Sequence, residues 1–298
     1  PDIKHDLQCL TPKSAIGFLV RALEMRWRKG LRPFTVLTLD NLPSNGHLIR
    51  QIICEFAAQI DTELTHWIET ECKFPCTMVD RIVPATTKAL IERASSISGY
   101  HDAAVVAHEP FRQWVIEDDF VDGMRPDFEA VNVQLVHDVA PFERMKLRML
   151  NGTHSALAYI GSLAGHETVA GAIGDKNIEN FIDALWHEEI AASIEAPPET
   201  DLNDYAMQLK SRYQNQDIRH LLEQIAMDGS QKIPQRILVP LFENLLAGKP
   251  SERFLVVVAA WFRYIETRSK NGHSRLNDPL EVELIRAART ASNDAALV

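Results

Sequence analysis

The chain of 298 residues is 46% hydrophobic, which is enough apolar sequence for a sizeable core, and its formal charge is −10. Because its basic residues form no cluster, the sequence argues against a nucleic-acid binder, which displaces counterions with grouped Lys and Arg. The apolar runs are shorter than the roughly 20 residues that cross a bilayer, and no signal peptide opens the sequence, so we expect a globular cytoplasmic protein.

The first part of the chain alternates predicted helices and strands. A helix is predicted over 11–30, where Thr11 is a plausible N-cap and Gly30 marks the stop. The β-branched run 34–39 predicts a buried strand before a turn, and helical periodicity returns over 46–60. Further strands are predicted at 103–107, 113–116 and 131–136. This alternation indicates an α/β layer up to about residue 137.

Beyond residue 137 the strand signals fade and helical patterns dominate. The predicted helices lie at 177–194, 202–214, 218–227, 233–248 and 252–267. We therefore predict a domain boundary at 138–141, which separates an α/β domain, 1–137, from a mostly helical domain, 138–298.

The sequence contains no complete metal-binding motif. Its four cysteines are sparse and are predicted to be reduced thiols. Cys72 and Cys76 are spaced C-x3-C, with no second pair and no histidine pair to complete a zinc site. The stretch WHEEI has Ala191 where the H-E-x-x-H motif needs its second histidine. No metal ion is therefore expected.

The stretch KLRMLNGTH places three polar side chains in an apolar run. With roughly 100° per helical residue, Lys146, His154 and Asn151 fall at about 0°, 80° and 140° on a helical wheel and could face one cleft. Such a trio suits carbonyl reduction or alcohol oxidation: the lysine exchanges a proton with the substrate oxygen, and the amide and imidazole hold that oxygen. A snorkelling lysine, a capping asparagine and a hydrogen-bonded histidine are the structural alternative, which the spacing alone favours.

No pair of glycines forms even a G-x-G, so the dinucleotide fingerprint of a Rossmann fold is not in this sequence. The phosphate-binding loop G-x-x-x-x-G-K-[ST] and the nucleophile elbow G-x-S-x-G are absent as well. The residues alone therefore do not support a complete NAD site.

Five sequence blocks lie in order between residues 38 and 238: TLDNLPSNG, MVDRIVPAT, EPFRQWVIEDDF, KLRMLNGTH and MDGSQKIPQRIL. Together they resemble the long-chain mannitol dehydrogenase family of polyol and uronate dehydrogenases. The resemblance implies an oxidoreductase that uses NAD. It implies an α/β plus all-α fold: the remainder of a Rossmann-like NAD domain, then a mostly helical substrate domain similar to the C-terminal domain of 6-phosphogluconate dehydrogenase.

The resemblance assigns the catalytic centre to the K-x4-N-x2-H block. Lys146 would be the general acid/base, while Asn151 and His154 would bind the reacting oxygen of the substrate. Asn41, in the D-N-L motif, would be a second oxyanion-stabilising asparagine that pairs with Asn151 and borders the cofactor. Because Lys146 does the proton work that zinc assists in other alcohol dehydrogenases, the resemblance implies no metal.

Three further residues match family positions beside the cofactor and on the proton path. Val79 and Asp80 of MVDRI would contact the nicotinamide side of NAD. Glu143, three residues before the lysine, would help the proton leave. The alternative for Glu143 is a helix-surface carboxylate that pairs with Lys146.

The substrate class depends on Lys232 and Gln224 within the resemblance. Lys232 matches a substrate-binding lysine, and a carboxylate-bearing substrate would suit it as a charge partner. Mannitol enzymes tend to carry arginine where this chain has Gln224, so the sequence looks like the uronate branch, which interconverts D-mannonate and D-fructuronate. The alternatives are a mannitol-type polyol 2-dehydrogenase and, for Gln224, a surface residue without a ligand.

The family resemblance also accounts for the missing glycines. Family members are longer, so the resemblance implies that their fingerprint lies upstream of anything corresponding to Pro1 and that their helical domain continues beyond the position of Val298. A cut, an omitted disordered segment and a natural short form all remain open. So does a non-catalytic remnant with weak cofactor affinity, since the phosphate-gripping loop is missing.

Overall fold

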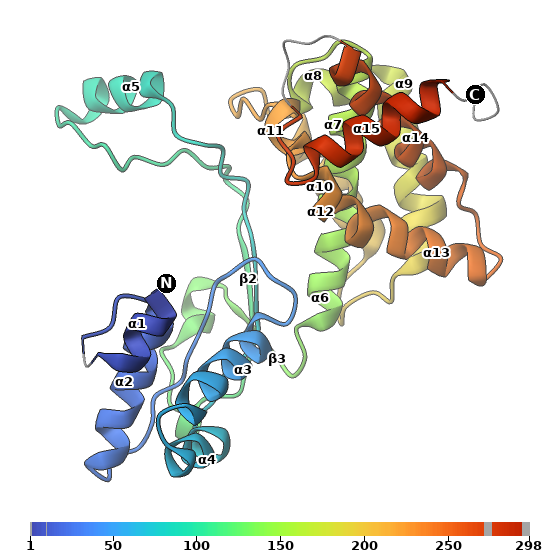
Figure 1. Cartoon of the computed structure of the whole chain (residues 1–298). Helices are drawn as coiled ribbons and strands as arrows, with labels where there is room; N and C mark the ends of the chain where they lie inside the picture. The colour runs from blue at the N-terminus through green and yellow to red at the C-terminus, as the bar shows by residue number, and fades with distance from the viewer. Residues whose placement is uncertain (1, 10, 271–275, 294–298) are drawn as a thin grey trace. The chain divides into compact units, whose positions relative to one another are not determined.

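The computed structural model describes residues 2–9, 11–270 and 276–293, and the chain divides into two compact units (Figure 1). Unit 1 comprises Pro1–Arg81 and Arg112–Glu143, and unit 2 comprises Ile82–Phe111 and Arg144–Val298. The unit boundary falls inside helix α6 (Ala140–Met145). The predicted division after residue 137 lies close to this point and stays a prediction.

Unit 1 contains a small sheet with the strand order β1-β2-β3. β1 (Thr77–Asp80) pairs antiparallel with β2 (Gln113–Glu117), and β2 pairs parallel with β3 (Gln134–Val136). The strand predicted at 113–116 is confirmed. The strand predicted at 131–136 is shortened to three residues, because a 3₁₀ turn ends at Val131 and the next residue adopts a positive φ.

The strands predicted at 34–39 and 103–107 are wrong, since in the described chain neither segment joins a ladder. In the first segment Val36 N–H donates to Lys73 C=O at 3.0 Å, but the Thr38 carbonyl accepts the Thr77 hydroxyl at 2.6 Å instead of a neighbouring strand. In the second, the Asp102 carboxylate accepts the N–H of Ala104 at 2.9 Å and favours a turn. Side-chain oxygens therefore replace strand pairing in both segments.

Four helices precede the sheet: α1 (Asp2–Gln8), α2 (Ala15–Arg28), α3 (Asn45–Ala58) and α4 (Thr62–Glu71). The helices predicted at 11–30 and 46–60 are confirmed, although the first starts later. Ser14, not Thr11, is its N-cap, because the Ser14 hydroxyl accepts the N–H of Gly17 at 3.0 Å. α4 was not predicted. Apolar faces of α2, α3 and α4 bury Leu23, Ile53 and Leu64 in one core.

Unit 2 is mostly helical and its core surrounds α7 (Thr153–Leu163), a helix in which eight of eleven residues are buried. Its other α-helices are α5 (Lys88–Ser98), α8 (Val169–Gly174), α9 (Lys176–Ala184), α10 (Leu202–Tyr213), α11 (Leu222–Ala226), α12 (Gly229–Ile233), α13 (Val239–Leu246), α14 (Glu252–Lys270) and α15 (Glu281–Asn293). Three π-helical turns, η3 (Lys146–Gly152), η4 (Leu185–Ile190) and η6 (Pro234–Leu238), and a short 3₁₀ turn, η5 (Ala191–Ser193), join them. Within the described residues, every helix is too short or too polar to cross a bilayer.

A buried ion pair anchors the segment between β1 and β2 in unit 2. Arg212 of α10 donates to the Glu109 carboxylate at 2.8 to 3.2 Å, and its guanidinium lies 4.0 Å from the ring centroid of Phe111. The same carboxylate accepts the N–H of Ile82 at 2.6 Å. Helix α5, which lies within this segment, buries none of its residues. The Glu109 contacts therefore hold both ends of the segment.

Replacing Glu109 with glutamine should lower the free energy of unfolding by about 3–5 kcal/mol, because the buried guanidinium of Arg212 loses its ion pair with the Glu109 carboxylate. Chemical denaturation measures the loss. Glu167→Gln is the matched control, since the Arg219–Glu167 pair is largely exposed and such pairs contribute about 0–1 kcal/mol. Equal effects of the two substitutions would contradict an anchoring role for the buried pair.

Candidate active site

The K-x4-N-x2-H block forms the π-helical turn η3 and the start of α7 (Thr153–Leu163). The α-helical wheel drawn from the sequence was therefore wrong for this turn. In a π-turn the backbone bonds link residues five positions apart, which brings Lys146 and Asn151 onto one face. Gly152 lets η3 pack closely on η6, because a Cβ at Gly152 would lie 3.2 Å from the carbonyl oxygen of Arg236.

Lys146 is buried at the start of this turn, with 8% of the residue exposed. A snorkelling lysine keeps its ammonium group in water, so this burial disfavours the structural alternative. Asn151, which is half-buried, follows one π-turn later, and its backbone carbonyl accepts a hydrogen bond from the Ser155 hydroxyl at 3.2 Å. The two residues therefore share one face of a short, largely buried turn.

His154 lies on the first turn of α7 and is 7% exposed. Its ring centroid is 4.7 Å from that of Tyr213 and 5.1 Å from that of His220. Its Nε2 is buried and has no hydrogen-bond partner among the described residues, so a ligand hydroxyl could bind there. Burial, and then the charges of His220, Arg236 and Arg212, hold the pKa of His154 well below its usual 6.5, so the ring is neutral.

Arg236, on η6, is a functional candidate that the sequence analysis missed. Its guanidinium donates to the Asn151 carbonyl at 3.5 Å and to the Ser155 hydroxyl at 3.3 Å, while its Nε is buried without a partner. Burial lowers the pKa of Arg236, and no carboxylate of the described chain pairs with it. Arg236 is half-buried, and a guanidinium partly removed from water without an anion carries a desolvation cost, so this position suits an anionic ligand. Its place one helical turn after Lys232 was a signal available in the sequence.

The two predicted substrate residues differ in burial. Lys232, on α12, is half-buried, and its ammonium group donates to the Ile225 carbonyl at 3.3 Å. Burial, and then the charge of Arg236, lower the pKa of Lys232. Gln224, on α11, is exposed. In unit 2 the structure therefore gathers Lys146, Asn151 and His154 on one helical run, with Lys232 and Arg236 as neighbouring cations.

The predicted cofactor residues lie in unit 1. Val79 is half-buried and Asp80 is buried, both in β1, while Asn41 is exposed on the turn before α3. Asn45, which the sequence analysis missed, fixes this turn: its amide donates to Asp40 C=O at 2.9 Å and accepts Thr77 N–H at 2.9 Å. The turn that carries Asn41 is thereby tied to β1. The pairing of Asn41 with Asn151 stays a prediction.

Glu143, the predicted proton-path residue, belongs to unit 1. Both of its carboxylate oxygens lie 3.2 Å from the N–H of Ser44, which donates to them at the start of α3. Burial raises the pKa of Glu143, and this backbone bond opposes the shift. Its role on a proton path stays a prediction, as does the alternative of a pair with Lys146.

At pH values below about 6.5, the free energy of unfolding should decrease because of His154. The folded state keeps this histidine neutral, whereas in the unfolded state it binds a proton below its normal pKa. Between about pH 7.5 and 5.5 this linkage costs about 1.4 kcal/mol, which His154→Gln should remove. Denaturation of both proteins at the two pH values measures the difference. The exposed control His101→Gln should keep the wild-type dependence, and an unchanged dependence in His154→Gln would refute the assignment.

Two domain models match consecutive parts of the chain. Residues 9–130 match the mannitol dehydrogenase Rossmann domain, and residues 138–298 match the mannitol dehydrogenase C-terminal domain. With the observed fold, they show a Rossmann-type domain that precedes a helical domain, and they confirm the expected fold class. The chain belongs to the mannitol dehydrogenase family.

The chain is similar to three named enzymes. It is 47% identical to D-mannonate oxidoreductase of Escherichia coli (strain K12) over 95% of this chain and 58% of the relative. It is 39% identical to mannitol 2-dehydrogenase of Aspergillus terreus over 99% of this chain and 60% of the relative. The solved Pseudomonas fluorescens mannitol 2-dehydrogenase, a ternary complex with NAD and D-mannitol, is 38% identical with a TM-score of 0.82 and covers 100% of this chain and 60% of its own. The chain thus spans about three fifths of these relatives.

Proposed function

We propose that the chain is part of an oxidoreductase that interconverts D-mannonate and D-fructuronate with NAD. The observation that carries the proposal is the half-buried Arg236, whose Nε is buried without a hydrogen-bond partner and whose guanidinium has no carboxylate partner in the described chain and lies beside Asn151 and Ser155. The substrate of the uronate branch brings a carboxylate, whereas a polyol brings none. The relationship to the E. coli enzyme supports the same choice.

The proposed division of labour takes its roles from the family resemblance, and the geometry within each unit supports it. NAD, when bound, exchanges a hydride with the substrate carbon. Lys146 takes the proton from the hydroxyl on that carbon, while the amide of Asn151 and the free Nε2 of His154 hold the oxygen. Asn41 would supply the second amide, and Glu143 would receive the proton from Lys146.

The end of β1 would form the part of the nicotinamide site that lies in this chain. Ligands of α/β proteins bind beyond the carboxyl ends of strands, and Val79 and Asp80 end β1. The half-buried Val79 offers an apolar contact for a ring, and Asp80, the last residue of β1, is buried. Residues 1–137 would accordingly belong to the cofactor domain and 138–298 to the substrate domain.

A mannitol-type polyol 2-dehydrogenase is the second candidate, supported by the similarity to the Aspergillus and Pseudomonas enzymes. If Gln224 takes part in substrate selection, Gln224→Arg should move the ratio of kcat/KM for D-mannitol over D-mannonate upward by about tenfold or more, the effect of one added hydrogen-bonding group. Steady-state kinetics with both substrates measure the ratio. Glu223→Gln, the exposed neighbour on α11, is the control. An unchanged ratio would remove Gln224 from substrate selection.

The deciding experiment follows NAD reduction by absorbance with D-mannonate and D-mannitol side by side, on the longest polypeptide that the gene encodes. Turnover of D-mannonate alone supports the proposal. Turnover of mannitol alone would move the assignment to the polyol branch. Inactivity on both, together with no saturable NADH fluorescence, would indicate a non-catalytic remnant.

A further inference from the structure

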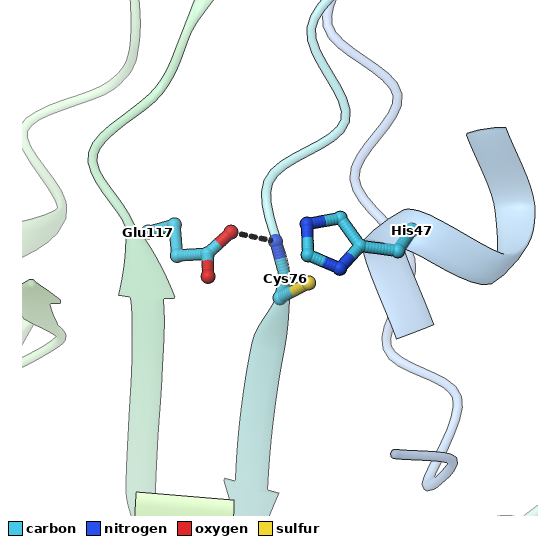
Figure 2. Close-up of side chains that lie close together, drawn as sticks. All are labelled: His47, Cys76 and Glu117. Carbon is cyan, nitrogen blue, oxygen red and sulfur yellow. Dashed lines mark hydrogen bonds between the residues drawn. The ribbon is translucent and has the colours of Figure 1, made fainter. Parts of the chain in front are cut away.

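Three metal-ligand side chains from distant parts of the sequence meet in unit 1. His47 lies on the first turn of α3, Cys76 directly precedes β1, and Glu117 ends β2. One ligand atom from each residue lies within 4.8 Å of the other two. Figure 2 shows the Cys76 sulfur beside the imidazole of His47, with the Glu117 carboxylate approaching from the neighbouring strand.

Backbone packing fixes the distance between His47 and Cys76. A Cβ on Gly46 would lie 2.3 Å from the carbonyl oxygen of Phe74 and 2.7 Å from the backbone nitrogen of Cys76, so only glycine permits this approach. One residue further out on each side, the Asn45 side chain accepts the Thr77 N–H at 2.9 Å and donates to the Thr77 carbonyl at 3.1 Å. The start of α3 is therefore held against the Cys76 backbone before any ligand arrives.

Glu117 is held to Cys76 by two hydrogen bonds. The Cys76 N–H donates to Oε2 of Glu117 at 2.7 Å, and the Glu117 N–H donates to the Cys76 carbonyl at 3.0 Å. This arrangement occupies one carboxylate oxygen and leaves the other for a ligand. A second carboxylate, Glu143, is close enough to act electrostatically with both Glu117 and His47. The local charge therefore favours a cation.

We propose that His47, Cys76 and Glu117 bind a divalent transition-metal ion of the zinc class. Thiolate, imidazole and carboxylate are the ligands that Zn²⁺ takes, at about 2.3 Å for sulfur and about 2.0–2.2 Å for nitrogen and oxygen. Three protein ligands leave a position for water, and the exposed His47 side chain can rotate to close the remaining gap. The all-oxygen preference of Mg²⁺ and Ca²⁺ excludes those ions as the main occupant.

The bound ion would add a further link between α3 and the start of β1, beside the Asn45–Thr77 hydrogen bonds. The amide of Asn45 already links Thr77 to the carbonyl of Asp40, one residue before Asn41. The metal site therefore lies at the base of the Asn41 turn, and its occupancy would stiffen that turn. The site rests on unit 1 alone and does not depend on the proposed oxidoreductase activity.

The test titrates chelator-treated protein, as the longest polypeptide of the gene, with Co²⁺ and records thiolate-to-cobalt charge transfer in the near ultraviolet. One Co²⁺ per chain, displaced by Zn²⁺, is the expected result. His47→Gln is the main variant because its position is exposed, and Cys76→Ser is the second. Each should weaken binding by at least about 100-fold, since even loss of an outer-shell partner costs 10–100-fold.

Cys9→Ser and Cys54→Ser are the matched controls, because both thiols are half-buried and free but lie outside the cluster. Both should retain the cobalt spectrum and its affinity. The proposal is overturned if the wild type gives no charge-transfer band, if folded His47→Gln binds as tightly as wild type, or if Cys54→Ser loses the signal equally. Circular dichroism of each variant confirms that the comparison is between folded proteins.

Discussion

Replacing Lys146 with alanine should lower kcat for sugar-acid oxidation by about 10²- to 10⁴-fold, the usual contribution of a positioned general acid or base. The lysine is buried one π-turn before Asn151, so solvent water cannot readily take its place. KM should change less than kcat, because the lost group acts on the proton in transit rather than on ground-state binding. Initial rates of NAD reduction measure the effect.

Two comparisons separate this chemical role from a packing role. Lys146→Met keeps most of the side-chain volume and should be as inactive as the alanine variant. Arg144→Ala removes an exposed cation two residues earlier and should stay within a few-fold of wild type. Activity retained by Lys146→Met in a folded protein would show that the lysine is not the proton acceptor.

Replacing Arg236 with glutamine should lower kcat/KM for D-mannonate by about 30- to 3,000-fold, which corresponds to the 2–5 kcal/mol of a buried charge pair that loses one partner. The substrate carboxylate would lose the guanidinium whose Nε has no partner in the free protein. Any turnover of D-mannitol should change far less, since a polyol brings no carboxylate. The ratio of the two kcat/KM values is therefore the decisive quantity.

Arg236→Lys and Arg219→Gln complete the Arg236 experiment. The lysine variant keeps a charge but loses the planar fork, so it should recover only part of the activity toward D-mannonate. Arg219 is exposed and pairs with Glu167, so its substitution should leave both substrates unaffected. Equal losses on D-mannonate and D-mannitol would mean that Arg236 supports the π-turn through Asn151 and Ser155 rather than selecting an anion.

Local patterns in the sequence predicted much of the fold but failed where side chains replace strand pairing. The helices over 11–30 and 46–60 follow from apolar residues at helical spacing, and the strand at 113–116 follows from a buried β-branched run. The apolar run 34–39 has the same local pattern, yet the Thr38 carbonyl, which a sheet ladder would use, accepts a hydrogen bond from the Thr77 hydroxyl. Whether a segment pairs as a strand depends on a second segment elsewhere in the sequence, and a local pattern carries no information about that second segment.

The family resemblance predicts a catalytic role for the K-x4-N-x2-H block, but it does not predict the geometry of this block. Spacing assumes 3.6 residues per turn, and only the structure reveals a π-turn that aligns Lys146 with Asn151. The sequence did not predict the cluster of His47, Cys76 and Glu117, because its members come from three different elements and the spacing of Cys76 to Cys72 matches no complete metal motif. Contacts between residues far apart in sequence carry no local spacing signal.

The segment between β1 and β2 makes it difficult to express either unit as one continuous fragment. Because Ile82–Phe111 belongs with the helical unit while both flanking strands belong to the other, each unit is discontinuous in sequence. An expression fragment beginning at residue 144 would contain Arg212 and lack Glu109, so it would bury a guanidinium without its carboxylate. A helical domain that folds alone should therefore include the segment Ile82–Phe111, joined to residue 144 by a short linker, and should not simply begin at residue 144.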